Sequence, residues 1–393
     1  MVGIMLFAKL NDLSIGGKGA YGIAASAVER KADLPTYLRI TDIFDDGTLN
    51  LSELKSVDAP NSDKYILKPN DIVFARTGGS TGRNYFYDGS DGVFVYAGFL
   101  IKFSIDPEKV NPKYVKYYCR SKQYNDWVQS FNTGSTRGNI NAQTFGNMEI
   151  PLPERKQQDY LVSILEPIDE KIKNNKQVND NLQQQAFSVF DNLIANAENN
   201  DYTVSDYAFL NPKRTLAKNQ VARSIDMSQL STSGAFPSGW EMKPFNGGMR
   251  FTNGDTLLAR ITPCLENGKT AFIDFLDDGE VAFGSTEYIV LAPKNDTPPE
   301  MLYCLARYPA FVDYAVKNMN GSSGRQRVSA ETVGQYRLPL FDKHSLVLFK
   351  EVVSPIFLKM RYNSLENMRL AELRDALLPK LMSGEIDVSA VQL

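Results

Sequence analysis

Four short loops, two in each half of the chain, carry the side chains best suited to binding chemistry. They are Arg76 to Arg83, Ser135 to Asn141, Arg260 to Lys269 and Ser322 to Arg327. Each loop mixes glycine with Ser, Thr, Asn, Gln or Arg, and such side chains and exposed amides suit the phosphate oxygens and base edges of DNA. A solvated turn is the alternative for any single loop. Four loops in matched positions favour contact with double-stranded DNA.

The predicted DNA-binding residues are the polar and basic members of these loops. They are Arg76, Thr77, Ser80, Thr81, Arg83, Ser135, Thr136, Arg137, Asn139, Asn141, Arg260, Thr262, Lys269, Ser322, Ser323, Arg325, Gln326 and Arg327. Positions with the same residue in both halves cannot by themselves explain two different DNA sequences, so we expect them to hold phosphates or the fold. Differing positions, such as Asn139 against Arg327, are expected to discriminate between bases.

Catalytic chemistry has little support in the sequence. The single histidine, His344, has no metal-ligand or triad companions at a useful spacing, and no phosphate-binding Gly-x-x-x-x-Gly-Lys loop is present. The nearest match to an Asn-Pro-Pro-aromatic motif is Asn211-Pro212-Lys213, which lacks the aromatic residue. We therefore predict no catalytic residue, no metal site and no cofactor in this chain. An enzyme with an unrecognised carboxylate site remains an alternative.

Composition bounds the class of protein. The chain has 393 residues and a net charge of -3, and no apolar run approaches the ~20 residues of a membrane span. The odd number and wide spacing of Cys119, Cys264 and Cys304 indicate reduced thiols in a cytoplasm. A simple nucleic-acid binder is usually basic, so DNA contact here must come from local clusters or with a partner's help.

Two long helices must position the loops. From Glu154 to Ile194 the apolar positions are spaced alternately four and three residues apart, a period typical of a helix whose seam faces another helix. The same pattern returns 188 residues later, from Asp342 to Ser383, with Asn at equivalent seam positions. The predicted pairing residues are Leu165, Ile168, Ile172, Asn175, Asn179, Leu182, Val353, Ile356, Met360, Asn363, Asn367 and Leu370. The alternative is two unrelated amphipathic helices, each packed on its own domain.

The repeat extends beyond the helices. The strand-like segment Asp71 to Arg76 is matched by Asp255 to Arg260, and the helical segment Pro112 to Ser121 is matched by the segment that begins at Pro298. Further strands are predicted over Tyr37 to Ile43 and Val93 to Phe103. The predicted fold class is α+β, with two similar mixed α/β modules separated by two long helices. The helices are expected to pair as an antiparallel coiled coil, which gives the chain a pseudo-two-fold internal repeat.

The predicted ranges follow from this order of module, helix, module and helix. They are residues 1–153, 154–199, 200–340 and 341–383, with a tail at 384–393. Pro167 recurs as Pro355, and a proline inside a helix is expected either to kink it or to begin a new section.

The chain resembles a known family, the specificity (S) subunits of Type I restriction–modification enzymes. The resemblance covers nearly the full chain and depends on the repeated order of modules and helices. It also depends on local signatures, which are Asp71 to Arg76, Ile150 to Pro153 leading into Gln157 and Gln158, Ile168 to Ile172, and Leu373 to Ile386.

The resemblance implies a role without catalysis. In that family each module is a target-recognition domain that reads one half of a split, asymmetric DNA target. The paired helices set the gap between the halves and dock two methyltransferase (M) subunits, which restriction (R) subunits join. S-adenosylmethionine, ATP and Mg²⁺ are used by those other subunits. The alternatives are the specificity subunit of a related Type IIB or IIG-like system and a scaffold that does not bind DNA.

Overall fold

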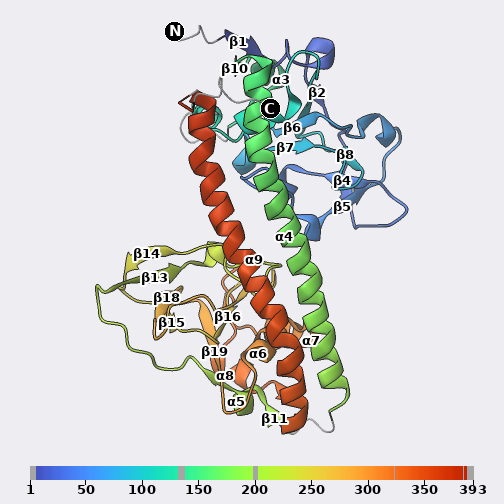
Figure 1. Ribbon diagram of the computed structural model, residues 1–393. Helices are drawn as coiled ribbons and strands as arrows, with labels where there is room; N and C mark the ends of the chain where they lie inside the picture. The colour runs from blue at the N-terminus through green and yellow to red at the C-terminus, as the bar shows by residue number, and fades with distance from the viewer. Residues whose placement is uncertain (1–5, 132–137, 198–201, 323, 384, 387–393) are drawn as a thin grey trace. The chain divides into compact units, whose positions relative to one another are not determined.

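The computed structural model describes residues 6–131, 138–197, 202–322, 324–383 and 385–386 (Figure 1). The chain divides into two compact units. Unit 1 contains residues 1–168 and 372–393, and unit 2 contains residues 169–371. The boundary therefore falls inside both long helices, α4 (Arg155–Ala195) and α9 (Lys343–Ser383).

Unit 1 contains ten strands and three short helices in the described part of the chain. The strands are β1 (Leu6–Lys9), β2 (Ala20–Tyr21), β3 (Ala27–Val28), β4 (Thr36–Leu38), β5 (Lys55–Val57), β6 (Asp71–Ala75), β7 (Asn84–Tyr87), β8 (Phe94–Tyr96), β9 (Leu100–Ser104) and β10 (Glu149–Leu152). The helices are α1 (Pro112–Tyr118), α2 (Lys122–Gln129) and α3 (Ala142–Gly146).

Unit 2 contains ten strands and four short helices in the described part of the chain. The strands are β11 (Tyr202–Thr203), β12 (Ala208–Leu210), β13 (Val221–Ile225), β14 (Glu241–Pro244), β15 (Met249–Phe251), β16 (Thr256–Ala259), β17 (Thr270–Phe272), β18 (Ala282–Gly284), β19 (Tyr288–Pro293) and β20 (Arg337–Leu338). The helices are α5 (Val204–Tyr207), α6 (Pro299–Arg307), α7 (Pro309–Lys317) and α8 (Ala330–Gly334).

The first sheets of the two units match strand for strand, whereas the second sheets share three strands and differ in the fourth, which is β3 beside β5 in unit 1 and β15 beside β18 in unit 2. The first four-stranded sheet has the order β2-β9-β6-β7 in unit 1 and β12-β19-β16-β17 in unit 2. The second contains one parallel pair in each unit, β4 with β8 and β13 with β18, and a two-stranded ribbon, β1-β10 or β11-β20, completes each set. The internal repeat predicted from the sequence is therefore confirmed at the level of topology.

The position of strand β6 between two cores explains why its sequence is apolar from Ile72 to Ala75. Ile72 and Phe74 face the core that contains α1 and α2, whereas Val73 and Ala75 face the core formed with the second sheet. A strand covered on both faces needs apolar residues at every position. In unit 2 the strand β16 does the same, with Leu258 in one core and Leu257 in the other.

Each long helix contributes to the core of both units. In unit 1, Leu161 and Leu165 of α4 pack in one cluster with Leu378 and Met382 of α9. In unit 2, Phe190 of α4 belongs to a cluster that contains residues of α9 from Leu346 to Met360.

Hydrogen bonds in unit 2 show that the helices pair in antiparallel fashion. The side-chain amide of Asn175 donates to Asn367 Oδ1 over 2.9 Å, and that of Asn363 donates to Asn179 Oδ1 over 2.8 Å. Asn175 and Asn363 are only 4% and 2% exposed. The repeat interchanges these two contacts, because 188 residues separate Asn175 from Asn363 and Asn179 from Asn367. The seam is therefore pseudo-symmetric, as a dimer interface would be.

The predicted fold class is confirmed, with local corrections. The strand predicted over Tyr37 to Ile43 is wrong beyond Leu38, because a 3₁₀ turn follows in which the backbone N–H of Arg39 donates to Asp42 Oδ2. The strand predicted over Val93 to Phe103 is two strands, β8 and β9.

The helix predicted over Pro112 to Ser121 ends at Tyr118. Ser121 instead caps α2, because its hydroxyl oxygen accepts the N–H of Tyr124. The alternative that Pro167 or Pro355 begins a new helical section is wrong, since α4 and α9 are single helices through both residues.

Candidate nucleic-acid interface

In unit 1 the two predicted loops meet at one backbone junction. Ile140 donates its N–H to the carbonyl of Arg76 over 2.9 Å, and Thr77 pairs with Asn139 as an isolated antiparallel bridge. The N–H of Arg76 is held by the carbonyl of Phe99 over 3.1 Å. Loops that are separated by some 60 residues of chain are thereby placed side by side at the end of β6.

Unit 2 repeats this junction bond for bond. Val328 donates its N–H to the carbonyl of Arg260 over 3.0 Å, and Ile261 pairs with Arg327 as an antiparallel bridge. The N–H of Arg260 is held by the carbonyl of Glu287 over 3.0 Å. The four predicted loops are therefore two structurally equivalent pairs.

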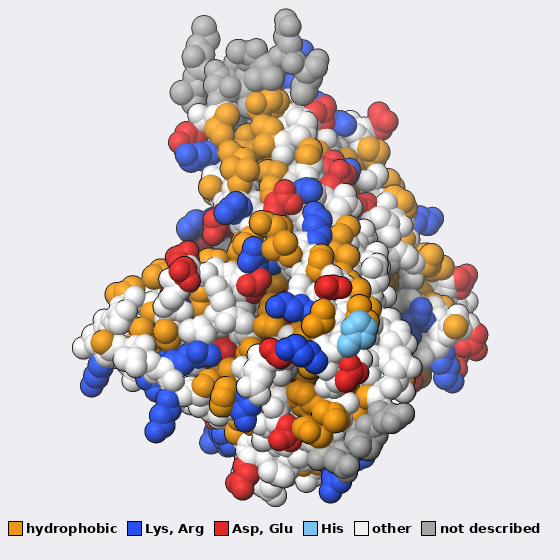
Figure 2. Space-filling view, turned by 60° about the horizontal axis from the view of Figure 1, so that its bottom comes forward, with side chains coloured by type: hydrophobic (Ala, Val, Ile, Leu, Met, Phe, Trp, Pro, Cys, Tyr) orange, Lys and Arg blue, Asp and Glu red, His pale blue; other side chains and the backbone are white. Residues whose placement is uncertain are grey.

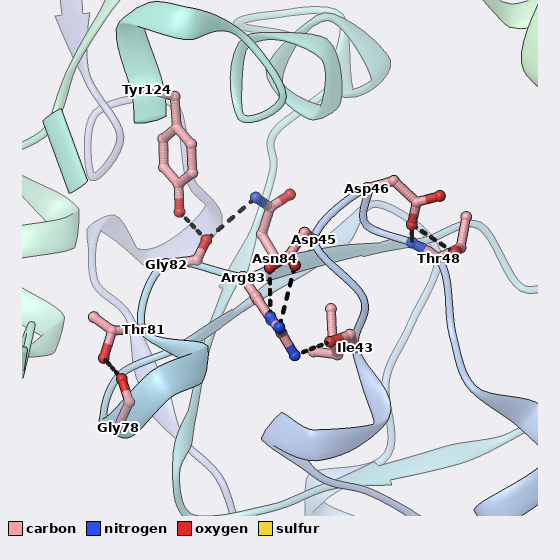
Figure 3. Close-up of polar contacts among 10 residues, drawn as sticks. All are labelled: Ile43, Asp45, Asp46, Thr48, Gly78, Thr81, Gly82, Arg83, Asn84 and Tyr124. Atoms are coloured by element: carbon pink, nitrogen blue, oxygen red, sulfur yellow. Dashed lines mark hydrogen bonds and ion pairs between the residues drawn. The ribbon is translucent and has the colours of Figure 1, made fainter. Parts of the chain in front are cut away.

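The loop from Arg76 to Arg83 is held in place by hydrogen bonds to its carbonyl groups (Figure 3). The hydroxyl of Tyr124 donates to the carbonyl of Gly82 over 2.5 Å, and Thr81 Oγ1 donates to the carbonyls of Gly78 and Gly138. Gly82 has φ of +88°, and a Cβ there would lie 2.4 Å from Val128 Cγ1. Only glycine fits this position, which fixes the path of the loop.

Three of the predicted basic residues bind within their own unit. Arg83 pairs with Asp45, with an Nε to Oδ1 distance of 2.6 Å (Figure 3). Lys269 Nζ donates to the carbonyl of Met227 over 2.8 Å. Arg327 makes a bidentate contact with Glu287, with an Nη2 to Oε1 distance of 2.7 Å.

The equivalent residues Arg76 and Arg260 are half-buried at the two junctions. The guanidinium of Arg76 lies 5.2 Å from the ring centroid of Tyr21. In both arginines Nε is buried and has no hydrogen-bond partner among the described residues. This burial at the base of the loops agrees with a role in holding the fold or a phosphate rather than in discriminating bases.

The remaining predicted residues have varied surroundings. Asn141 caps α3, because its side-chain oxygen accepts the N–H of Thr144 over 2.9 Å. Arg325 and Ser322 are exposed, and Thr262 and Gln326 are half-buried, with a bond of 3.0 Å from the N–H of Thr262 to the carbonyl of Gln326. Ser135, Thr136, Arg137 and Ser323 lie outside the described residues.

A cleft of about 740 Å³ adjoins the loops of unit 1. Gly78, Thr81 and Arg83 line one side of this cleft, and Arg120 and Arg374 also line it. Asp45, Asp46 and Asp375 share its wall, so the cleft contains charges of both signs. On the face shown in Figure 2, Lys and Arg side chains are likewise intermingled with Asp and Glu rather than gathered in one basic patch.

Three residues near the junctions were missed by the sequence analysis. The ring of Tyr21 lies beneath the guanidinium of Arg76, and its hydroxyl oxygen accepts the N–H of Ala142 over 3.1 Å. Phe99 and Glu287 lie at equivalent places in the two junctions. Their 188-residue spacing was a usable signal, whereas that of Tyr21 was not, because β2 is only two residues long.

Three further observations concern chemistry and membrane insertion. His344, the single histidine, is exposed at the start of α9. In the described ranges, no group of three or more His, Cys, Asp or Glu side chains is arranged to hold a metal ion. None of the described helices combines the length and the apolar character needed to cross a membrane.

The comparisons with known proteins agree with these features. The family model described as "Type I restriction modification DNA specificity domain" matches residues 29–184. The HindI specificity subunit of Haemophilus influenzae is 22% identical, over 91% of this chain and 97% of that protein. This chain therefore carries a Type I restriction–modification DNA specificity domain, and its similarity to a Type I specificity subunit extends over nearly its full length. The MjaIX specificity subunit of Methanocaldococcus jannaschii is 21% identical, over 72% of this chain and 71% of its relative.

A solved structure has the same fold as this chain. The Type I S subunit from M. genitalium aligns with a TM-score of 0.54 at 16% identity and covers 97% of both chains. At that identity the likeness concerns the arrangement of the elements, not the residues that contact a ligand.

Proposed function

We propose that each unit binds one half of a split, asymmetric DNA target through its pair of junction loops. The observation that carries this proposal is the duplicated junction. The backbone bonds around Arg76 and Arg260 are the same, yet the side chains that the junctions display differ, with Asn139 in one and Arg327 in the other. One scaffold with two sets of displayed residues suits the recognition of two different short sequences.

In this proposal the paired helices set the gap between the two halves of the target and dock two M subunits. The asparagine hydrogen bonds across the seam support the first role, because buried polar pairs fix the register of paired helices at a cost in stability. R subunits then join the complex. The chain itself performs no chemistry, and S-adenosylmethionine, ATP and Mg²⁺ serve the other subunits.

Methylome sequencing tests the proposal. Cells that express the chain with the M subunit of its system should carry methylation at one bipartite sequence, and cells without the chain should not. Exchange of residues 1–153 for the equivalent module of a relative should change only one half of that sequence. A change in both halves, or methylation without the chain, would contradict the proposal.

The absence of chemistry in the isolated chain needs its own experiment. The purified chain should leave plasmid DNA intact in the presence of Mg²⁺, and it should shift a DNA duplex more strongly when the M subunit is added. Cleavage by the isolated chain would overturn this part of the proposal.

A further inference from the structure

The two junctions differ in one pair of neighbouring side chains. Glu287 and Arg327 occupy in unit 2 the places that Phe99 and Asn139 occupy in unit 1, as the matching backbone bonds to Arg260 and Arg76 show. Unit 1 therefore presents an exposed aromatic ring and an amide at this place, since Phe99 is 57% exposed and Asn139 is also exposed. Unit 2 presents a carboxylate and a guanidinium that bind each other.

The guanidinium of Arg327 is held by hydrogen bonds to Glu287 and to the backbone of Arg325. Its Nε–H is shared between the two carboxylate oxygens of Glu287 at 3.0 and 2.9 Å, and Nη2 donates to Oε1 over 2.7 Å. Nη1 donates to the carbonyl of Arg325 over 3.0 Å. An arginine has five N–H donors. Among the described residues, these contacts use three of them and leave one on each terminal nitrogen.

The backbone beneath Arg327 is also fixed. Asn320 and Arg327 exchange two backbone hydrogen bonds of 2.9 Å each, so the residue closes a small hairpin. Its side chain nevertheless keeps 38% of its surface exposed. The hydrogen bond from Arg327 lowers the pKa of Glu287, which keeps this carboxylate ionised and in place at neutral pH.

We propose that Glu287 is a positioning residue that orients Arg327 to read a guanine in the half-target bound by unit 2. Guanine presents two acceptors, O6 and N7, in the major groove, and an arginine with one free donor on each terminal nitrogen matches them bidentately. Glu287 removes the rotational freedom that a lone arginine would lose on binding. This inference rests on the proposed function, and in the described part of unit 1 the place of Arg327 is taken by Asn139.

The test measures base preference position by position. The full chain and its variants are assembled with the M subunit, and the complex methylates a duplex library randomised over both halves of the target. For Arg327→Gln, the preference for guanine at one position of one half should fall roughly 5- to 150-fold, the range for one bidentate contact. Glu287→Gln should weaken the preference at that same position, with every other position unchanged.

Two further variants keep the test decisive. Arg327→Lys retains the charge but not the planar fork, so it should retain methylation and lose the guanine preference even if Arg327→Gln folds poorly. Arg325→Gln is the matched control, because Arg325 lies exposed on the same hairpin without an ion pair in the described part of the chain. It should weaken methylation about evenly across sequences.

Several results would overturn the inference. The inference fails if the wild-type target contains no guanine whose preference depends on Arg327, or if Arg327→Lys keeps the full preference. It also fails if Glu287→Gln weakens every position alike, as a merely structural ion pair would. Failure of the proposed function is a different result, because the wild-type complex would then methylate no bipartite target at all.

Discussion

Units 1 and 2 have the same first sheet and the same loop junction, but the side chains at that junction differ. In unit 1 the pair at the junction is Phe99 and Asn139, and in unit 2 it is Glu287 and Arg327. Backbone hydrogen bonds hold both junctions, so the displayed side chains are free to differ without loss of the fold. The comparison shows that the backbone of the junction can stay the same while the side chains displayed on it change.

The largest effect is expected at Gly82, whose counterpart in unit 2 is Gly268. Gly82→Ala should lower the free energy of unfolding of unit 1 by roughly 2–5 kcal/mol, because strain in the left-handed backbone adds to a clash with the buried side chain of Val128. Gly268→Ala should cost less, since its Cβ meets only the far end of Arg307. Hydrogen exchange of peptides from each unit measures both effects. Equal costs would show that the two loops are supported alike.

The second prediction concerns Asp255, which lies at the start of β16 in unit 2. Burial raises its pKa to about 6, although Arg214 and the N–H of Thr252 favour the ionised form. A raised pKa means that the folded state holds the proton more tightly. The contribution of this carboxyl group to stability is therefore full below about pH 4 and is lost as the pH rises through 6.

The difference amounts to about 3 kcal/mol, at about 1.4 kcal/mol for each unit of pKa. Asp255→Asn stays uncharged, so it should flatten this part of the pH dependence of unfolding in urea between pH 4 and pH 7. An unchanged slope would show that Asp255 does not titrate in this range. The control is the single variant Asp45→Asn, which changes an exposed carboxyl group and keeps Asp255.

The helix seam gives the third prediction. Asn175→Ala and Asn363→Ala should each lower the free energy of unfolding of unit 2 by about 1–3 kcal/mol, because each removes a buried amide that is hydrogen-bonded to a half-buried partner across the seam. Their costs should be similar, since the repeat interchanges the two contacts. Urea unfolding of the full chain measures both, and Asn174→Ala on the exposed face of α4 is the matched control. A cost for only one of the two would break the pseudo-symmetry.

The smallest effect is expected at the pair formed by Arg83 and Asp45. The Asp45 side chain is 85% exposed, so Asp45→Asn should change the free energy of unfolding by less than about 1 kcal/mol. The ion pair chosen for comparison in unit 2 is that of Glu287 with Arg327. The Glu287 carboxylate is 26% exposed and the contact is bidentate, so the second variant is Glu287→Gln. That variant should be the more costly of the two in thermal unfolding. The reverse order would show that exposure does not control these pairs.

The sequence alone predicted the long helices because their period is strong and repeats. It also predicted the buried strand from Asp71 to Ala75, whose apolar run matches a strand covered on both faces. It did not predict α2, because Ser121 reads as the end of the preceding helix until its capping bond to Tyr124 is seen. The domain ranges and the DNA-contacting residues predicted from the sequence stay predictions.

The sequence by itself determined that the chain is duplicated and that four loops occupy equivalent places. Identical spacing and side-chain type are local properties, and they survive without any knowledge of the fold. Only the tertiary structure decided that the loops meet in pairs and that Glu287 holds Arg327. Bonds between residues 40 positions apart depend on how the sheet brings its strand ends together, and no local pattern encodes that meeting.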